Sequence, residues 1–438
     1  FDFRIENISQ MSAVEKSFHL NQFREKDIKL GFDLSKGPLF RLTIFELGAN
    51  QYQVIWTFHH IILDGWSLGI ILNDLFAFYK DLLNKRAIDR EDAPLYNQYI
   101  QWLANCDKLA GLKYWKNYLS DIEKQTKIPQ KISEQHNGFK LSKIIKKLTI
   151  NDTDKLKKLA KDNGLTLNTV VQTIWAACLN RWCGEDTIVF GTTISGRQAD
   201  IKNIENMVGL FINTIPVKFN FQEDKSFLEL ATQFQKSFTE SEKNSYCSLA
   251  QIQNESLLKS DLINHLMVFE NYPLDEMQTK LSELGFQIKE IGGFEHTNYD
   301  FEVVVIPQHK LHLEFKFNEN KYDQDLVEDL FLHFEFLCTQ VTDKPNSNFN
   351  QLNSLKIEIQ KKLINEVNQS WDLTKAQFSK DYTVVDMFEL QASKYPQKTA
   401  VFTNHNKISY GELSRLSNII AQNWHSNGIL RLTMNHPY

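Results

Sequence analysis

Two adjacent histidines, with an aspartate four residues later, form the part of this sequence best suited to chemistry. His59 and His60 follow an apolar, aromatic stretch, and Asp64 precedes Gly65 at the start of a helical pattern. Histidine titrates near neutral pH, so an imidazole here can take a proton from an amine or hydroxyl nucleophile. A carboxylate at Asp64 can pair with a distant arginine and lock the loop that positions His60, and Gly65 permits a close backbone approach.

The two histidines end a predicted strand, and this decides where each side chain points. Residues 39–47 (LFRLTIFEL) and 51–59 (QYQVIWTFH) are rich in β-branched and aromatic residues, and a Gly-Ala-Asn tripeptide separates them. This pattern predicts a hairpin. Because side chains alternate faces along a strand, His60 shares the face of Trp56 and His59 points the other way. We therefore expect His60 to project from an aromatic-lined face into a cavity.

The remaining pattern predicts an α/β chain. Residues 1–30 are polar and compatible with helix, whereas Ser67 is expected to cap a helix with one buried face that extends to Leu83. A capping box at Ser226 and Glu229 opens another helix. Other helices are expected at 97–103, 109–119, 152–161, 167–182 and 325–341. Other strands are expected at 140–150, 187–195, 214–221, 266–270, 286–291, 301–306 and 311–317.

Simpler interpretations of the histidine pair fit the same residues. A histidine near a strand end is more often a hydrogen-bonded structural residue than a catalyst. A metal site is disfavoured because His59 and His60 diverge and no nearby histidine or glutamate completes a ligand set. Ser67 is not a hydrolase nucleophile, because no GxSxG elbow surrounds it. Spacing alone therefore leaves the structural and catalytic interpretations open.

Length and composition exclude several classes of protein. The 438 residues favour two or three domains, and 42% hydrophobic with 12% aromatic residues argue against extended disorder. A net charge of −5 argues against a nucleic-acid-binding protein. No apolar run is long enough to cross a bilayer. The five cysteines are scattered, without a CxxC pair for zinc or a disulfide framework, which fits a reducing cytoplasm.

Four segments, in order along the chain, resemble condensation domains of nonribosomal peptide synthetases, relatives of chloramphenicol acetyltransferase. Residues 59–67 (HHIILDGWS) resemble the family's HHxxxDGWS signature, and 96–103 (YNQYIQWL) resemble YxDYxxWL with Gln98 at the acidic position. The third match joins Ser195-Gly196-Arg197 to 207–216 (MVGLFINTIP), and the fourth is 269–273 (FENYP). Several acyltransferase families share HHxxxD, but four ordered matches indicate condensation domains.

The resemblance implies an α/β (α+β) fold of two chloramphenicol acetyltransferase-like lobes arranged as a V-shaped pseudo-dimer. The first lobe is expected at 1–122, and it is N-terminally truncated because the family's early SxxQxRxW and RHExLR motifs are absent. The second lobe is expected at 139–341, after a polar linker. A further linker is expected at 342–380.

The last segment, 381–438, resembles a partial adenylation-domain N-terminus. Residues 408–413 (ISYGEL) resemble its (T/S)YxEL motif, and the resemblance fades after Gly428. Because this segment is too short for an enzyme domain, we expect 384–438 to be an unstructured remnant.

The family's reaction joins a carrier-bound aminoacyl amine to a carrier-bound donor thioester. By position, His60 is the catalytic histidine, as a general base or as a group that orients the amine. Asp64 and Arg197 form a structural pair, and His59 packs on the opposite face. Gly65 allows substrate access, and four residues are assigned to the substrate tunnel or to a segment that bridges the lobes: Trp66, Gly209, Asn213 and Thr214.

The resemblance also implies the partners of the chain. No metal and no directly bound cofactor are expected, because the phosphopantetheine arms of peptidyl and aminoacyl carrier proteins deliver the substrates. The adenylation domain of the same module is a further partner, and neither nucleic acid nor membrane is expected. Three other functions share parts of the signature: an acyl-CoA-dependent acyltransferase, an epimerisation domain and a catalytically silent carrier-protein docking domain.

Overall fold

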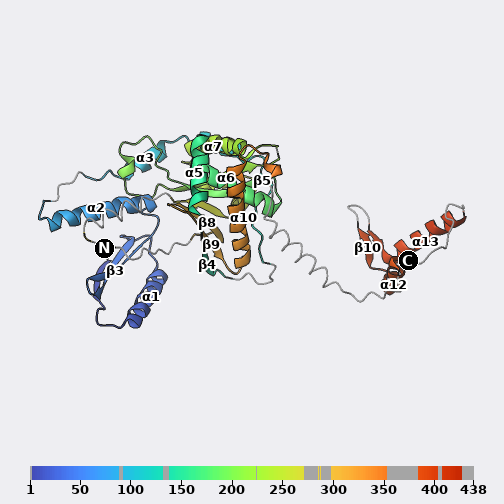
Figure 1. Ribbon diagram of the computed structural model, residues 1–438, viewed down its shortest axis with the longest axis horizontal. Helices are drawn as coiled ribbons and strands as arrows, with labels where there is room; N and C mark the ends of the chain where they lie inside the picture. Colours follow the sequence, from blue (N-terminus) through green and yellow to red (C-terminus); the bar gives the residue numbers. More distant parts are fainter. Residues whose placement is uncertain are drawn as a thin grey trace. The chain divides into compact units, whose positions relative to one another are not determined.

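The computed structural model describes residues 2–87, 92–131, 138–222, 224–270, 285, 287, 297–352, 383–402 and 407–426 (Figure 1). The chain divides into two compact units, residues 1–356 and 357–438. Helices and strands are interspersed along it, so the predicted mixed α/β class is confirmed. The predicted strand at 286–291 and most of the FENYP segment lie outside the described residues.

The first unit begins with a three-stranded sheet in the order β1-β2-β3. The predicted hairpin is present as β2 (Phe40–Gly48) and β3 (Gln51–Phe58), whereas β1 (Asp2–Asn7), parallel to β2, was not predicted. Four of its six residues are charged or polar, which hides the strand in the sequence. Helix α1 (Ala13–Leu30) packs on the sheet, where Phe23 contacts the fully buried Phe45 edge to face.

Three helices follow the hairpin: α2 (Gly65–Leu83), α3 (Asn97–Asn105) and α4 (Lys108–Tyr118). The predicted helices are therefore present, but the expected buried face of α2 is not. Ser67 is the one residue of α2 that is buried, and Leu75 and Leu82 are more than half exposed. Apolar spacing identifies a face that can pack, but it does not supply the partner.

A six-stranded sheet organises the second lobe, in the order β4-β9-β8-β7-β5-β6. Neighbouring strands are antiparallel except at the β5–β7 and β7–β8 pairs. The strands are β4 (Leu141–Lys147), β5 (Thr187–Ile194), β6 (Asn213–Asn220), β7 (Leu266–Phe269), β8 (Phe301–Pro307) and β9 (Leu311–Asn318). The helices are α5 (Ile150–Asp162), α6 (Leu167–Cys183), α7 (Phe227–Lys243), α8 (Leu249–Asn254) and α10 (Gln324–Asp343).

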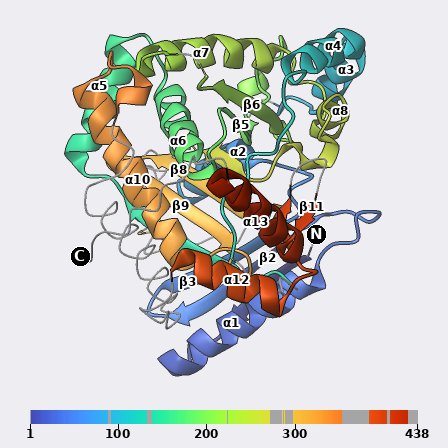
Figure 2. The same cartoon turned by 90° about the vertical axis from the view of Figure 1, so that its right-hand side faces the viewer.

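The two faces of this sheet have different cores. Helices α5, α6, α7 and α10 cover one face and form the larger core with it (Figure 2). On the other face, α4 and α8 cover the β5–β6 edge, where Trp115 of α4 is fully buried beside Val189 and Ile215. Because β5 is covered on both faces, it is buried along nearly its whole length. Helix α4 thus belongs to the second lobe's core, although the expected boundary at 122 assigns it to the first lobe.

Two segments expected as linkers also contribute to the core. In the first, Ile128 is buried in the larger core, and the buried Thr126 Oγ1 accepts a hydrogen bond from the Val189 amide at 2.8 Å. In the second, Phe349 and Leu352 pack on the larger core. The polar composition of both segments hides these few apolar anchors.

The second unit contains folded elements, which contradicts the expected unstructured remnant. Its described elements are α12 (Val384–Lys394), β10 (Thr399–Phe402), β11 (Lys407–Ser409) and α13 (Tyr410–Ser426). A capping box between Thr383 and Asp386 starts α12, and β10 pairs antiparallel with β11. The local signals for a helix start and a hairpin are therefore strong enough here, despite the short length of the segment.

Two buried histidines should make the stability of the fold depend on pH. Trp175 donates a hydrogen bond to His265 Nε2 at 3.1 Å, and Trp182 donates to His333 Nδ1 at 3.0 Å. Burial lowers the pKa of His265 to about 3, and burial together with Arg181 lowers the pKa of His333 to about 4. Below the ordinary histidine pKa of about 6.5, the unfolded chain therefore binds more protons than the folded chain. The stability that these two neutral histidines contribute is therefore complete above that pH and is lost as the pH falls.

Between pH 7.5 and pH 4.5 each histidine should cost about 2–3 kcal/mol of unfolding free energy. The measurement is urea unfolding at both pH values. The matched variants are His265→Gln and His333→Gln, since an amide oxygen still accepts from the tryptophan but does not titrate. A smaller pH-dependent loss is expected in each variant, and an unchanged loss would contradict the assignment.

Candidate active site

The histidine pair lies in the turn between β3 and α2. Strand β3 ends one residue before His59, so the strand is one residue shorter than predicted. The His59 amide donates to Leu39 O at 2.9 Å, and its Nδ1 accepts from the Ile61 amide at 3.1 Å. The Phe32 ring meets the His59 ring edge to face, with centroids 6.3 Å apart. These contacts hold His59 in the turn, and His60 is half-buried beside it.

Asp64 closes this turn and caps α2. Its Oδ1 accepts hydrogen bonds from the Ser67 amide (2.9 Å) and hydroxyl (2.8 Å), and its Oδ2 accepts from the Phe211 amide at 3.0 Å. The prediction that Ser67 caps the helix is therefore wrong: Asp64 is the N-cap, three residues earlier. The reason is geometric, because the capping oxygen must reach an amide two or three residues ahead, and Asp64 reaches that of Ser67.

Arg197 reaches the same carboxylate from the second lobe. Its Nη2 lies 3.3 Å from Asp64 Oδ1, so the predicted contact between these residues is present. Its Nη1 donates to Ile204 O at 2.7 Å and to Met207 O at 2.8 Å, and its guanidinium lies over the Phe211 ring. Burial lowers the pKa of Arg197, and the neighbouring Asp64 carboxylate opposes that shift. The ion pair is therefore a buried, charged link between the lobes.

The turn that carries Arg197 requires glycine. Gly196 has a φ of +65°, and a Cβ on it would lie 1.8 Å from the Phe211 carbonyl oxygen. No larger residue could adopt this turn without moving the 207–211 segment.

Gly209 packs against the aromatic ring of Tyr96, the residue that precedes α3. A Cβ on Gly209 would lie 2.1 Å from Cδ2 of Tyr96, whose hydroxyl donates to Leu210 O. The Gly209 carbonyl oxygen accepts from the Asp64 amide at 3.2 Å. The segment around Gly209 therefore contacts both the start of α2 and the residue that precedes α3.

The other predicted site residues divide into two groups. Gly65 is the first residue of α2, and the next residue, Trp66, lies at the contact between the lobes, where its Nε1 donates to Glu205 O at 3.0 Å. Asn213 and Thr214 begin β6 and make their described contacts inside the second lobe. Asn213 Nδ2 donates to Ser245 O and Cys247 O, and Thr214 pairs with Thr193.

The sequence interpretation missed four residues that build this contact: Ser67, Tyr96, Gly196 and Phe211. All four lie inside the quoted motifs, so the motif positions themselves were the available signal. For Ser67, Tyr96 and Phe211 the importance comes from contacts between segments more than 100 residues apart, as in the Ser67–Gly209 hydrogen bond, whose partners are separated by 142 residues.

Gly209→Ala tests how tightly the contact is packed. We expect a loss of about 1–3 kcal/mol of unfolding free energy, because the Tyr96 ring is held by its hydroxyl and cannot move aside. Urea unfolding measures this. Gly69→Ala is the matched control, since nothing lies within 4 Å of its added Cβ. Equal stability of the two variants would contradict the packing described.

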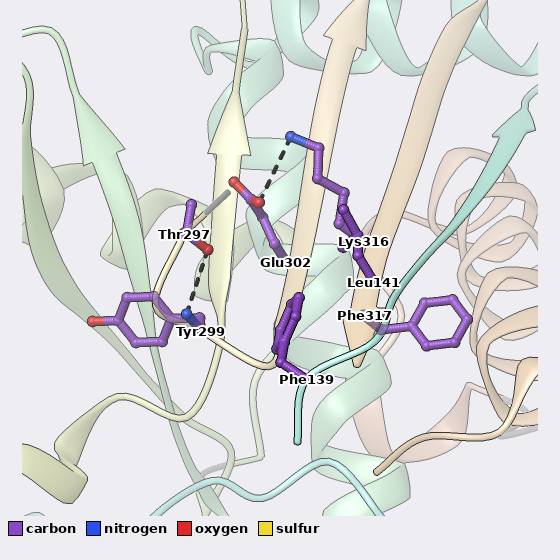
Figure 3. A pocket seen from close by; sticks show the side chains of 7 residues that line it. All are labelled: Phe139, Leu141, Thr297, Tyr299, Glu302, Lys316 and Phe317. Atoms are coloured by element: carbon purple, nitrogen blue, oxygen red, sulfur yellow. Dashed lines mark hydrogen bonds and ion pairs between the residues drawn. The ribbon is translucent and has the colours of Figure 1, made fainter. Parts of the chain in front are cut away.

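A pocket on the second lobe's sheet is separate from this contact. Within it, Lys316 Nζ lies 3.7 Å from Glu302, and the Tyr299 amide donates to Thr297 Oγ1 at 3.4 Å (Figure 3). None of its lining residues belongs to the Asp64–Arg197 contact. They are Phe139, Leu141, Thr297, Tyr299, Glu302, Lys316 and Phe317.

The described part of the chain contains neither a cluster of metal ligands nor a membrane-spanning helix. Across those residues no three side chains from histidine, cysteine, aspartate and glutamate are grouped to hold a metal ion. No helix within the described ranges is both long enough and apolar enough to cross a membrane.

Comparison with known proteins identifies the family. The condensation domain model matches residues 1–364. The chain is 36% identical over 427 residues to bacitracin synthase 3 of Bacillus licheniformis, covering 96% of this chain and 7% of that protein. It is 35% identical over 430 residues to tyrocidine synthase 2 of Brevibacillus parabrevis, covering 97% of this chain and 12% of that protein. The chain thus spans a small fraction of these relatives.

Solved structures show the same fold. A four-domain nonribosomal peptide synthetase bound to AMP and glycine aligns with a TM-score of 0.64 and 21% identity, over 98% of this chain and 33% of that chain. The first condensation domain of the calcium-dependent antibiotic synthetase, in complex with a substrate analogue, aligns with a TM-score of 0.60 and 16% identity, over 81% and 78% of the two chains. The chain therefore belongs to the condensation domain family of nonribosomal peptide synthetases.

Proposed function

We propose that this chain forms an amide bond between two carrier-bound substrates. The α-amine of an aminoacyl thioester attacks the carbonyl carbon of a donor thioester. The C–N bond forms, the C–S bond breaks, and the donor's pantetheine thiol leaves with the proton that the amine gives up. The product remains on the acceptor carrier, longer by the donor group.

His60 is the residue that we place at the attacking amine. One observation carries this assignment: the turn that holds His60 ends at Asp64, whose buried carboxylate binds Arg197 and the Phe211 amide. An imidazole held there can accept the amine proton or orient the amine. Because a thioester is already activated, much of the acceleration would come from holding the two tethered reactants together.

The other residues serve the position of His60. Asp64 and Arg197 hold the end of the turn in place. His59 is its first residue, and the hydrogen bond from its amide to Leu39 O fixes that end. Gly65 leaves room for substrate, and Trp66 and Gly209 lie where the lobes meet. Asn213 and Thr214 support this segment from inside the second lobe.

The partners belong to the proposal as well. Phosphopantetheine arms of peptidyl and aminoacyl carrier proteins deliver the substrates, and no cofactor binds this chain directly. The relatives align over nearly the whole chain, beyond the matched condensation domain at 1–364, which supports residues 381–438 as the start of an adenylation domain of the same module. A cytoplasmic location fits the five free cysteines.

The decisive experiment offers the same donor acyl group on two handles. One reaction contains the donor on a carrier protein and the other contains it as a coenzyme A thioester, each with a loaded acceptor carrier. The proposal expects product with the carrier-bound donor and far less with the coenzyme A thioester. Equal use of both indicates an acyl-CoA-dependent acyltransferase. Inversion at the donor α-carbon without amide formation indicates an epimerisation domain, and carrier binding without reaction indicates a docking domain.

A further inference from the structure

The hydroxyl of Ser67 lies at the centre of the contact between the lobes. Ser67 is completely buried. Its Oγ accepts a hydrogen bond from Arg197 Nη2 at 3.1 Å and another from the Gly209 amide at 3.1 Å. Because a hydroxyl oxygen has two lone pairs, these donors use its whole accepting capacity.

The single proton of this hydroxyl has two acceptors within reach. Asp64 Oδ1 lies 2.8 Å away and Gly209 O lies 2.9 Å away. A hydroxyl donates one hydrogen bond at a time, and donation to either acceptor leaves both accepted bonds in place. Ser67 therefore holds the start of α2 to Arg197 and to the Gly209 backbone simultaneously.

We propose that Ser67 is a positioning residue for the condensation reaction. Its hydroxyl holds the first turn of α2, and with it the turn from His60 to Asp64, against the 207–211 segment of the second lobe. Only three residues separate His60 from Asp64, and the Ile62 amide closes the turn on His59 O at 3.2 Å. A shift of the α2 start would therefore move the His60 imidazole. The inference rests on the proposed function.

Ser67→Ala leaves Arg197 Nη2 and the Gly209 amide without the acceptor they share. We expect kcat for amide formation to fall about 10- to 100-fold, because a displacement of about 1 Å at the reacting groups costs this much. The KM for the loaded acceptor carrier should stay within about twofold, since the variant changes geometry and not the docking surface.

The matched control is Ser241→Ala, which removes another completely buried hydroxyl from the second lobe. Ser241 Oγ lies 2.8 Å from the Tyr114 hydroxyl, and neither residue belongs to the Asp64–Arg197 contact. A comparable loss of melting temperature is expected in both variants, but only Ser67→Ala should lose kcat. Equal kcat values for the two variants would overturn the proposal.

Hydrogen–deuterium exchange tests the positioning role without relying on activity. In Ser67→Ala, exchange should rise in peptides covering residues 59–68 and 207–211, and it should not rise there in Ser241→Ala. If Ser67→Ala does not fold, Ser67→Cys provides the same comparison with a weaker hydrogen-bonding group. Unchanged exchange overturns the proposal even if the wild type condenses substrates. Faster exchange supports the positioning role, and an inactive wild type would then overturn only the proposed function.

Discussion

Replacing His60 by alanine should reduce amide formation at least about 100-fold, because general acid–base assistance contributes roughly 10²–10⁴-fold to such reactions. The imidazole is half-buried in a turn, so its loss should leave the fold intact. Rates are measured with loaded donor and acceptor carriers, and the melting temperature is measured on the same samples. The proposed function thus predicts a large loss of rate without a loss of stability.

His59→Ala is the control for this variant. His59 is fixed by Leu39 O, the Ile61 amide and the Phe32 ring, and the proposed function therefore assigns it to the turn and not to the reacting amine. We expect the His59 variant to retain substantially more activity than the His60 variant. Near-normal condensation by His60→Ala would remove the assignment of the catalytic residue.

Replacing Asp64 by alanine should have the largest effect on stability, a loss of about 3–5 kcal/mol. The variant strands the guanidinium of Arg197, whose side chain is only 6% exposed, without its carboxylate. It also removes the acceptor of the Phe211 and Ser67 amides. Urea unfolding measures the loss.

The control variant Asp107→Ala measures the stability lost with a helix N-cap when no buried charge is left unpaired. Asp107 is exposed and caps α4 by accepting from the Ala110 amide at 3.0 Å. Its loss should cost about 1 kcal/mol, the ordinary value for an N-cap.

In an Asp64→Ala background, Arg197→Met should recover part of the lost stability, since it removes the stranded charge. An Asp64 variant no less stable than the Asp107 variant would show that the buried pair contributes little.

Much of the local structure could be predicted from the sequence. The β2–β3 hairpin and the helix that begins at the Ser226 capping box follow from short-range patterns, and the structure contains both. The errors also have local causes. The N-cap of α2 was placed at Ser67 because serine and aspartate compete for that position, and only the backbone geometry decides between them.

The contact between the lobes could be predicted only in part. The resemblance to condensation domains implies that Asp64 meets Arg197, and the structure contains that contact. Nothing local to Ser67, Tyr96 or Phe211 indicates that they meet near Gly209, because each contact joins segments far apart in the chain. For the same reason, the sequence could not show that α4 packs in the second lobe's core.

The proposed function requires the transfer of a donor group from one carrier protein to the amine on another. Intact-protein mass spectrometry of the acceptor carrier measures this directly, after the chain is mixed with loaded donor and acceptor carriers. We predict that the acceptor carrier gains the mass of the donor acyl group, and that this gain is almost absent with His60→Ala. An acceptor carrier of unchanged mass, or an equal gain with the variant, would contradict the account.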